Sequence, residues 1–147
     1  MALYKHLIAW KECHQLVLDV YKATEKWPKY ELYGLTSQTR RAVFSGAVNI
    51  VEGATRKGRN EFKRFLSISL ASLAEVEYAL DVAAALGYLE PPVCDALAIQ
   101  QRRARSMTWK LQRSLGKPPG VLRRPPATLL IRTARGTSAT PTAHLPC

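Results

Sequence analysis

The sequence predicts an all-α protein, namely an antiparallel up-down four-helix bundle over residues 1–115, followed by an irregular Pro/Arg-rich tail over residues 116–147. Apolar residues recur at steps of three and four in four segments with short connections, which is typical of amphipathic helices. No strand-like alternation occurs before residue 116. After it, six of the nine prolines and five cations occur without a single acid, a composition that does not favour a packed core.

The first helix is expected over residues 3–26, ending before Pro28. The residues expected to be buried follow one another by about one helical turn along a single face: Leu3, Leu7, Trp10, His14, Val17, Tyr21 and Thr24. Because His14 lies within this apolar stripe, we interpret it as a core or interface histidine rather than a metal ligand.

The second helix is expected from Thr36, as its N-cap, to residue 54. One face consists mainly of small residues that let another backbone approach: Leu35, Thr39, Ala42, Gly46, Asn49 and Gly53. The reverse side is also apolar, with Phe44, Ala47, Val48, Val51 and Ala54. A helix that is apolar nearly all round must be buried on both sides. We therefore expect one of its two sides to pack against a second subunit.

The third and fourth helices have clear boundaries. The third is expected from Asn60, as N-cap, to residue 86, with Gly87 ending it, and the fourth from Pro91-Pro92 to residue 115. The third carries the stripe Phe62, Leu66, Ser69, Leu73, Val76, Leu80 and Ala83. The buried side of the fourth comprises Val93, Leu97, Ala104, Met107, Leu111 and Leu115.

The charge of the chain indicates a polyanionic partner. The formal net charge is +11, and residues 117–147 contribute five cations (Lys117, Arg123, Arg124, Arg132 and Arg135) with no acid. The three cysteines are scattered without a CxxC pair, and no apolar run has the length of a signal peptide or a membrane span. We therefore expect a cytoplasmic protein of a reducing compartment, with no membrane partner.

A carboxylate inside an apolar helix first raises the question of catalysis. Glu52 follows Asn49 by one helical turn, but its helix carries no second carboxylate for acid–base chemistry. The sequence also has no Glu-x-x-His metal motif, phosphate-binding Gly-x-x-x-x-Gly-Lys loop or nucleophile elbow. We therefore expect the protein to have no enzymatic activity and no catalytic residue, and to bind neither a metal ion nor a cofactor. Asn49 and Glu52 are instead interpreted as a structural polar contact, with Arg41 or Arg56 as the partner of Glu52.

Two cationic clusters are candidates for nucleic-acid binding. The first surrounds the expected start of the third helix, where free backbone N–H groups favour a phosphate: Arg56, Lys57, Arg59, Lys63 and Arg64. A solvated loop with Glu61 satisfying the helix dipole explains it equally well. The second lies on the fourth helix, where Arg102, Arg105 and Arg113 surround Trp109. Proteins that bind single-stranded nucleic acid combine cations with an aromatic stacking surface in this way. Packing of Trp109 against a neighbouring subunit is the alternative.

The chain also resembles a known family. The stretch LTSQTRRAVFSGAVNIVEGATRKGRNEFKRFLSISLASLAEVEYAL, with WKECHQLVLDVYKATEKWP before it and LGYL after it, is similar to the four-helix-bundle proteins of the 23S rRNA intervening-sequence family. The resemblance covers about residues 5–115. It implies a homopentameric barrel with a basic surface and no enzymatic activity. Related proteins include the accessory variability determinant of diversity-generating retroelements, which implies binding to nucleic acid and a reverse transcriptase.

Residue by residue, the resemblance carries over to Arg41, Asn49, Glu52 and Gly53 in the second helix, and to Phe62, Phe65 and Leu66 in the third. The leading hypothesis is therefore a homo-oligomer that binds RNA or DNA without sequence specificity. A protein–protein adaptor that docks on a polymerase or reverse transcriptase is the main alternative, and an intrinsic ribosomal component is a further one.

Overall fold

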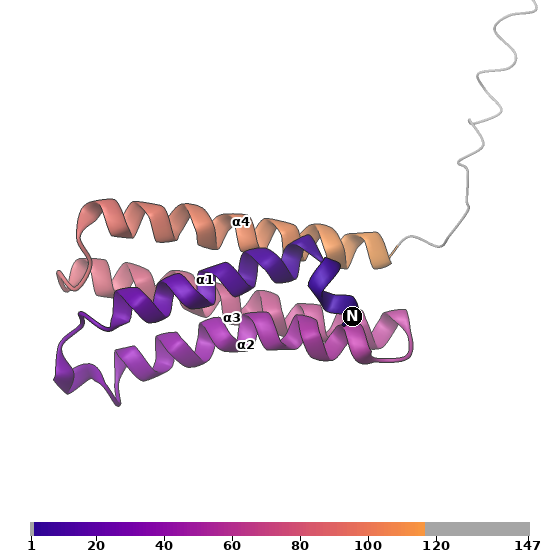
Figure 1. Ribbon diagram of the computed structural model, residues 1–147, viewed down its shortest axis with the longest axis horizontal. Coiled ribbons are helices and arrows are strands. Elements are labelled where there is room, and N and C mark those ends of the chain that lie inside the picture. The colour runs from indigo at the N-terminus through magenta and orange to yellow at the C-terminus, as the bar shows by residue number, and fades with distance from the viewer. Residues whose placement is uncertain (1, 117–147) are drawn as a thin grey trace, which may run out of the picture. The chain divides into compact units, whose positions relative to one another are not determined.

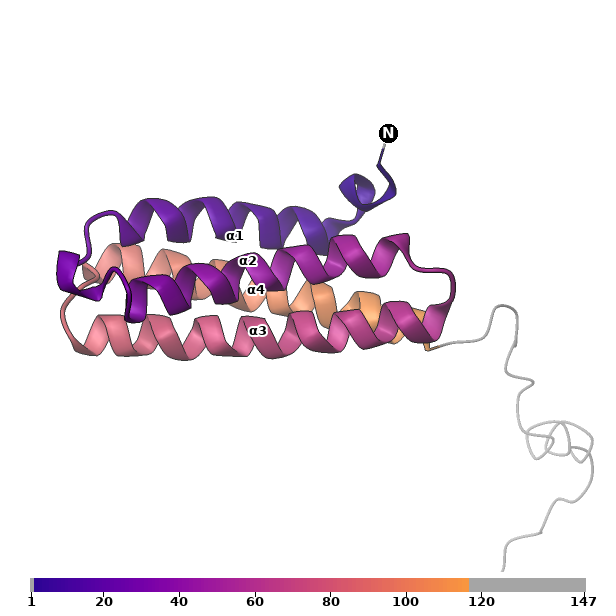
Figure 2. The ribbon, with the colours of Figure 1, turned by 90° about the horizontal axis from the view of Figure 1, so that it is seen from below.

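The computed structural model describes residues 2–116, which form four long helices: α1 (Ile8–Thr24), α2 (Leu35–Thr55), α3 (Arg59–Ala85) and α4 (Pro91–Leu115). Short 3-10 helices, η1 (Leu3–His6) and η2 (Lys29–Glu31), precede α1 and α2. Successive helices run antiparallel, as Figures 1 and 2 show, and the predicted up-down bundle is confirmed. The tail predicted over residues 116–147 lies, apart from Gly116, outside the described residues.

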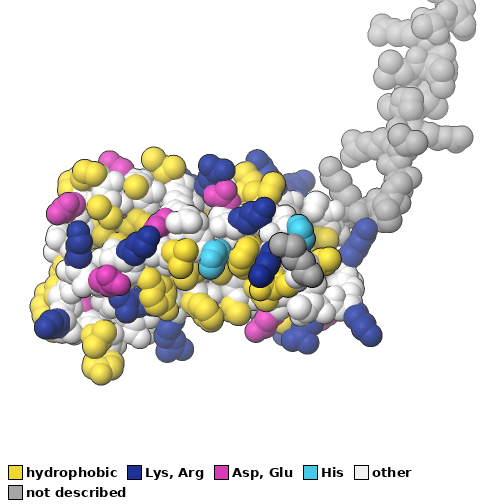
Figure 3. Space-filling view, in the orientation of Figure 1, with side chains coloured by type: hydrophobic (Ala, Val, Ile, Leu, Met, Phe, Trp, Pro, Cys, Tyr) yellow, Lys and Arg dark blue, Asp and Glu magenta, His cyan; other side chains and the backbone are white. Residues whose placement is uncertain are grey.

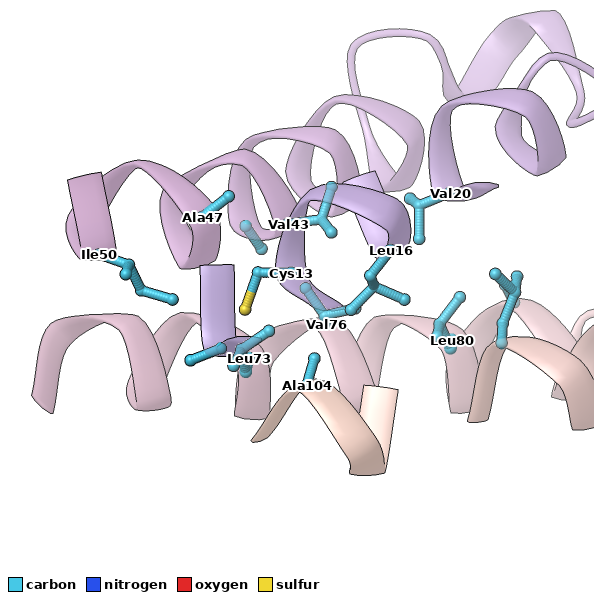
Figure 4. Close-up of a cluster of buried hydrophobic side chains, with 14 of the residues drawn as sticks. Cys13, Leu16, Val20, Val43, Ala47, Ile50, Leu73, Val76, Leu80 and Ala104 are labelled. Carbon is cyan, nitrogen blue, oxygen red and sulfur yellow. The ribbon is translucent and has the colours of Figure 1, made fainter. Parts of the chain in front are cut away.

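The core runs along the axis of the bundle, and all four helices contribute to it (Figure 4). Its largest fully buried apolar side chains are Leu16, Ile50, Leu66 and Leu73. The stripe predicted for the third helix is confirmed, with Phe62 half-buried at its end. On α4 the predicted side is also largely buried or packed against the core, but Val93 is 37% exposed near the helix start.

Most polar groups within the core are paired with one another or with backbone carbonyls, whereas the buried indole N–H of Trp27 has no hydrogen-bond partner among the described residues. The Gln101 side chain is 1% exposed, and its Nε2 donates to the Leu73 carbonyl at 2.8 Å, joining α4 to α3. The Cys13 thiol lies 3.6 Å from the Thr108 hydroxyl, between α1 and α4. Burial raises the pKa of Cys13 to about 11, so the thiol stays protonated at neutral pH and does not act as a nucleophile.

Helices α2 and α3 approach each other closely because the facing residues of α2 are small. The Ser69 hydroxyl donates to the backbone carbonyl of Gly46 at 2.6 Å. At Gly53 a Cβ atom would lie only 2.6 Å from the Phe62 ring and 2.9 Å from the Phe65 Cβ. The predicted small-residue face is thus the contact surface with α3, and the side chains of Phe62 and Phe65 occupy the space that Gly53 leaves.

The buried face of α1 differs from the prediction. The residues in the core are Ala9, Cys13, Leu16, Val20 and Thr24, whereas the predicted stripe lies about 100° round the helix, except at Thr24. On that stripe His14 is exposed, Tyr21 is 40% exposed, and Trp10 and Val17 are half-buried. The reason is that α1 carries two adjacent apolar stripes, and the one with the smaller residues enters the crowded interior.

Two predicted N-caps lie two residues too late in the sequence. Thr36 is buried inside α2 rather than at its N-cap, which is Gly34. The Glu31 carboxylate accepts a hydrogen bond from the Leu35 backbone N–H at 2.9 Å, so a side chain outside the helix replaces the expected cap. Helix α3 begins at Arg59, before the expected cap Asn60, because Gly58 adopts a φ of +120° that favours glycine.

Among residues 2–116, no helix combines the length and hydrophobicity that crossing a membrane requires.

Candidate nucleic-acid interface

The cationic loop of the first cluster is held in place by aromatic packing. It joins α2 to α3 over residues 56–58, directly after the close contact at Gly53. The Arg56 guanidinium lies 5.1 Å from the centre of the Phe65 ring, a cation–π contact that covers one face of that ring. Lys57 is exposed beside it. The loop is therefore anchored to α3 through Arg56, while Lys57 remains exposed.

Lys63 lies where the first cluster meets the second. The Gln112 side chain of α4 donates to the Lys63 carbonyl at 3.1 Å and to the Ser67 hydroxyl at 2.7 Å. Lys63, Gln112 and Arg113 also line one small hollow of about 310 Å³, together with Gly116. The start of α3 is thus fastened to the end of α4, and Lys63 of the first cluster adjoins Arg113 of the second.

The second cluster is built around Trp109, which is 48% exposed. The Arg113 guanidinium, one turn further along α4, lies 4.8 Å from the centre of the indole. Arg105 forms an ion pair with Glu77 of α3 at 3.2 Å, in which both side chains are about half exposed. Such exposed pairs contribute only about 0.2–1 kcal/mol, so Arg105 can exchange Glu77 for a phosphate at little cost.

Charge is distributed unequally along the bundle. The half that holds the α2–α3 loop and the end of α4 comprises residues 2–16, 46–72 and 103–116. We call it the basic half, because it carries eleven Lys or Arg against Glu12, Glu52 and Glu61. The opposite half, residues 17–45 and 73–102, carries eight carboxylates against six cations. Lys and Arg side chains are visible around the basic end in Figure 3.

Sequence reasoning missed part of this surface. Lys5, Lys11 and Lys110 were not among the predicted residues, yet they belong to the basic half, as does Arg103, which pairs with Glu12 at 3.0 Å. Conversely, Arg102 lies just outside it, on the exposed side of α4. The antiparallel path of the chain explains the omission, since the start of α1 and the end of α4 meet only in the folded bundle. The sequence alone gives no indication that these two segments lie close together.

The predicted structural polar contact is only half correct. Asn49 is buried, and its amide donates to the Ser45 carbonyl at 2.8 Å and to the Ser45 hydroxyl at 3.1 Å. The Ser45 hydroxyl in turn bonds to Ser72 of α3 at 2.8 Å, so this network joins the two helices. A structural role for Asn49 is therefore supported.

Glu52 does not take part in this network. It is exposed, and the two ion pairs found within residues 2–116 involve neither Arg41 nor Arg56. The physical reason is the position of Glu52 round α2: its side chain is exposed, whereas Asn49 and Gly53 belong to the buried row that faces α3. The expectation of a buried, paired Glu52 is wrong for the single protomer.

A metal-binding cluster is not apparent in the described part of the chain. No group of three or more His, Cys, Asp or Glu side chains among residues 2–116 is arranged to hold a metal ion. His14, a candidate ligand in principle, stacks on Trp10 with ring centres 4.9 Å apart.

Comparison with known proteins agrees with the sequence resemblance. The profile of the 23S rRNA-intervening sequence protein family matches residues 5–110, which span α1 to α4 almost completely. The chain belongs to this family. A similar solved structure is that of a protein of unknown function from the S23 ribosomal protein family of Bacteroides thetaiotaomicron. It has a TM-score of 0.67 and 15% sequence identity, and the alignment covers 71% of this chain and 98% of that one.

At this level of identity the solved relative shows the fold alone. No curated protein matches the chain. Membership of the 23S rRNA-intervening sequence protein family thus agrees with the observed four-helix bundle.

Proposed function

We propose that this bundle binds RNA or DNA through its basic half, without enzymatic activity and without sequence specificity. The observation that carries the proposal is the union of two cationic clusters, distant in sequence, at the junction of Lys63 with Gln112 and Arg113. A surface of this sign and extent attracts the phosphate backbone of any nucleic acid. None of the four described helices resembles a recognition helix with base-reading side chains, so we expect contacts to the phosphate backbone to dominate.

The salt dependence of binding tests this proposal. We expect the association constant for RNA or duplex DNA to fall steeply with salt, with a slope of about −0.9 per phosphate contact on duplex DNA. The measurement is a fluorescence-anisotropy titration at several salt concentrations. An affinity that is unchanged between low and physiological salt, or no binding at low salt, contradicts the proposal.

We further propose that copies of the chain assemble, with a pentamer favoured by the family resemblance. Support comes from an outer apolar surface that we call the α1–α2 face: Trp10, His14, Val17, Tyr21, Phe44 and Val51. The four residues of this face on α1 follow one another by about one helical turn. On α2, Phe44 and Val51 lie on the same side of the helix as Arg40. Because Arg40 contacts Tyr21 at 4.9 Å and Thr24 at 2.8 Å, the two stripes lie side by side.

Phe44, which is 56% exposed, offers a direct test of assembly. We expect Phe44→Glu to shift the chain from an oligomer to a lone protomer, since a carboxylate opposed to an apolar surface is costly to bury. Size-exclusion chromatography with light scattering at micromolar concentration gives the mass. Tyr33→Glu, at an exposed residue outside this face, is the matched control and is expected to leave the mass unchanged. A native chain that is already monomeric contradicts the assembly proposal.

A protein–protein adaptor remains the second candidate function, and a groove at the other half of the bundle favours it. This groove has a volume of about 800 Å³, with an apolar floor that includes Ala23, Val93 and Leu97, and lysines among its lining residues. Its size and lining are typical of a recognition site. In this role the chain would dock on a reverse transcriptase or another polymerase. A partner protein that co-purifies after nuclease treatment supports the adaptor, and one lost on treatment supports direct nucleic-acid binding.

A further inference from the structure

A hollow on the α3–α4 surface lies next to the exposed indole of Trp109. Its volume is about 450 Å³, within the range of ligand sites, and its lining consists of Leu70, Arg102, Arg105, Ser106 and Trp109. Leu70 is half-buried and the other four are exposed. The hollow thus combines an apolar and aromatic wall with two guanidinium groups at its margin.

The two sides of the Trp109 ring have different surroundings. Arg113, one turn after Trp109, lies over the ring at 4.8 Å. The hollow is formed with residues that precede Trp109 by three to seven positions, so it lies on the N-terminal side of the ring. Side chains on a helix lean towards its N-terminus, which directs the indole over this hollow. A flat group that enters the hollow can therefore stack on the indole without displacing Arg113.

The arrangement of charge identifies the flat group. Arg102 and Arg105 adjoin the hollow, and Arg113 lies beyond the ring, so cations lie on both sides of a stacking surface along α4. In a single strand each base projects from a sugar that carries a phosphate on either side, so a base that stacks on the indole brings phosphates towards the surrounding cations. In a duplex the base faces are covered by their stacked neighbours, and only the phosphates are accessible.

We infer that this hollow, which we call the Trp109 site, binds an unpaired nucleobase of single-stranded RNA or DNA by stacking on the indole. This inference rests on the proposed nucleic-acid binding and adds to it the class of ligand: single strands in preference to duplexes. Lys63 and the α2–α3 loop hold the backbone of the same strand nearby, because the basic surface continues from Arg113 to Lys63.

The test compares three probes of equal length: a single-stranded oligodeoxyadenosine 12-mer, the same 12-mer paired in a duplex, and an abasic 12-mer with the same phosphates. We expect Trp109→Ala to weaken binding of the single strand about 5- to 150-fold, the range found when one stacking aromatic is removed. Binding of the duplex and of the abasic strand should change less than about twofold. Trp109→Phe, which retains a stacking ring, should restore much of the loss.

A second readout follows the indole directly. The single-stranded 12-mer should quench the intrinsic fluorescence of the native chain, and this quenching should disappear in Trp109→Phe and persist in Trp27→Phe. Trp27 is the matched control because it is buried in the opposite half of the bundle, where it packs near Tyr88.

The outcomes separate the two proposals. If the abasic and duplex probes bind but Trp109→Ala leaves single-strand affinity unchanged, or weakens all three probes equally, the Trp109 site is refuted while nucleic-acid binding stands. If none of the three probes binds the native chain at low salt, the proposed function itself is refuted, and the Trp109 site with it.

Discussion

Removing three cations from the basic half, in the variant Lys57→Ala/Arg64→Ala/Arg113→Ala, is expected to weaken nucleic-acid binding roughly 100- to 1,000-fold at 0.1 M salt. The three residues are exposed and come from the α2–α3 loop, α3 and α4, so each sits in a different part of the joined surface. Each lost phosphate contact should also reduce the salt slope on duplex DNA by about 0.9. Anisotropy titrations at several salt concentrations measure both quantities.

The opposite half of the bundle provides a control of equal charge. The variant Lys22→Ala/Lys26→Ala/Lys29→Ala also removes three exposed cations, but from α1 and the segment after it. We expect its affinity to stay within a few-fold of the native value. Equal weakening in both variants would mean that binding follows the net charge of the chain, and the basic half would then have no special role.

Gly53→Ala is expected to destabilise the bundle by about 1–3 kcal/mol, the usual cost of overpacking. The added methyl group would lie 2.9 Å from the Phe65 Cβ, an atom that moves only with the α3 backbone, and 2.6 Å from the Phe62 ring. The helix must therefore shift or the Phe62 ring must rotate out of the core. With a shift of about 4–8 °C in Tm per kcal/mol for small domains, thermal unfolding followed by circular dichroism resolves the effect.

Gly46→Ala is the matched control for this prediction. Its methyl group would meet the flexible end of the Leu73 side chain at 3.1 Å, and Leu73 can adjust by a few tenths of an ångström. Alanine also gains up to about 1 kcal/mol over glycine in helix propensity, which offsets the crowding. We expect Gly46→Ala to remain closer to the native stability than Gly53→Ala. The reverse order would show that the α2–α3 contact is not limited by space at Gly53.

Local patterns accounted for most of the fold. The four helices and the buried stripes of α2 and α3 follow from periodicity, because the repeat of apolar residues is a property of each segment alone. Their antiparallel order follows from the short connections between them. The end of α3 follows from Gly87, whose φ of +75° is one that glycine adopts readily. The buried face of α1 was predicted less well. Two adjacent stripes of this helix are apolar, and periodicity alone does not show which of them faces the core.

The candidate site was only partly accessible from the sequence. The loop cations and the stripe around Trp109 were recognised separately, because each cluster is contiguous or helically spaced. Their junction at Lys63 and Gln112 was not, since it joins residues 49 positions apart. Glu52 was misassigned because an acid within an apolar run suggests burial, whereas its angular position round the helix decides whether its side chain faces a neighbouring helix or solvent.

The amino-acid sequence by itself determined that this protein is a four-helix bundle of the 23S rRNA-intervening sequence protein family with a large excess of cations. Only the tertiary structure decided where that excess lies. Antiparallel packing brings the start of α1, the α2–α3 junction and the end of α4 to one end of the bundle, while most carboxylates fall in the other half. Charge acts through space rather than along the chain, so a modest net charge per helix becomes a concentrated basic surface once the helices pack.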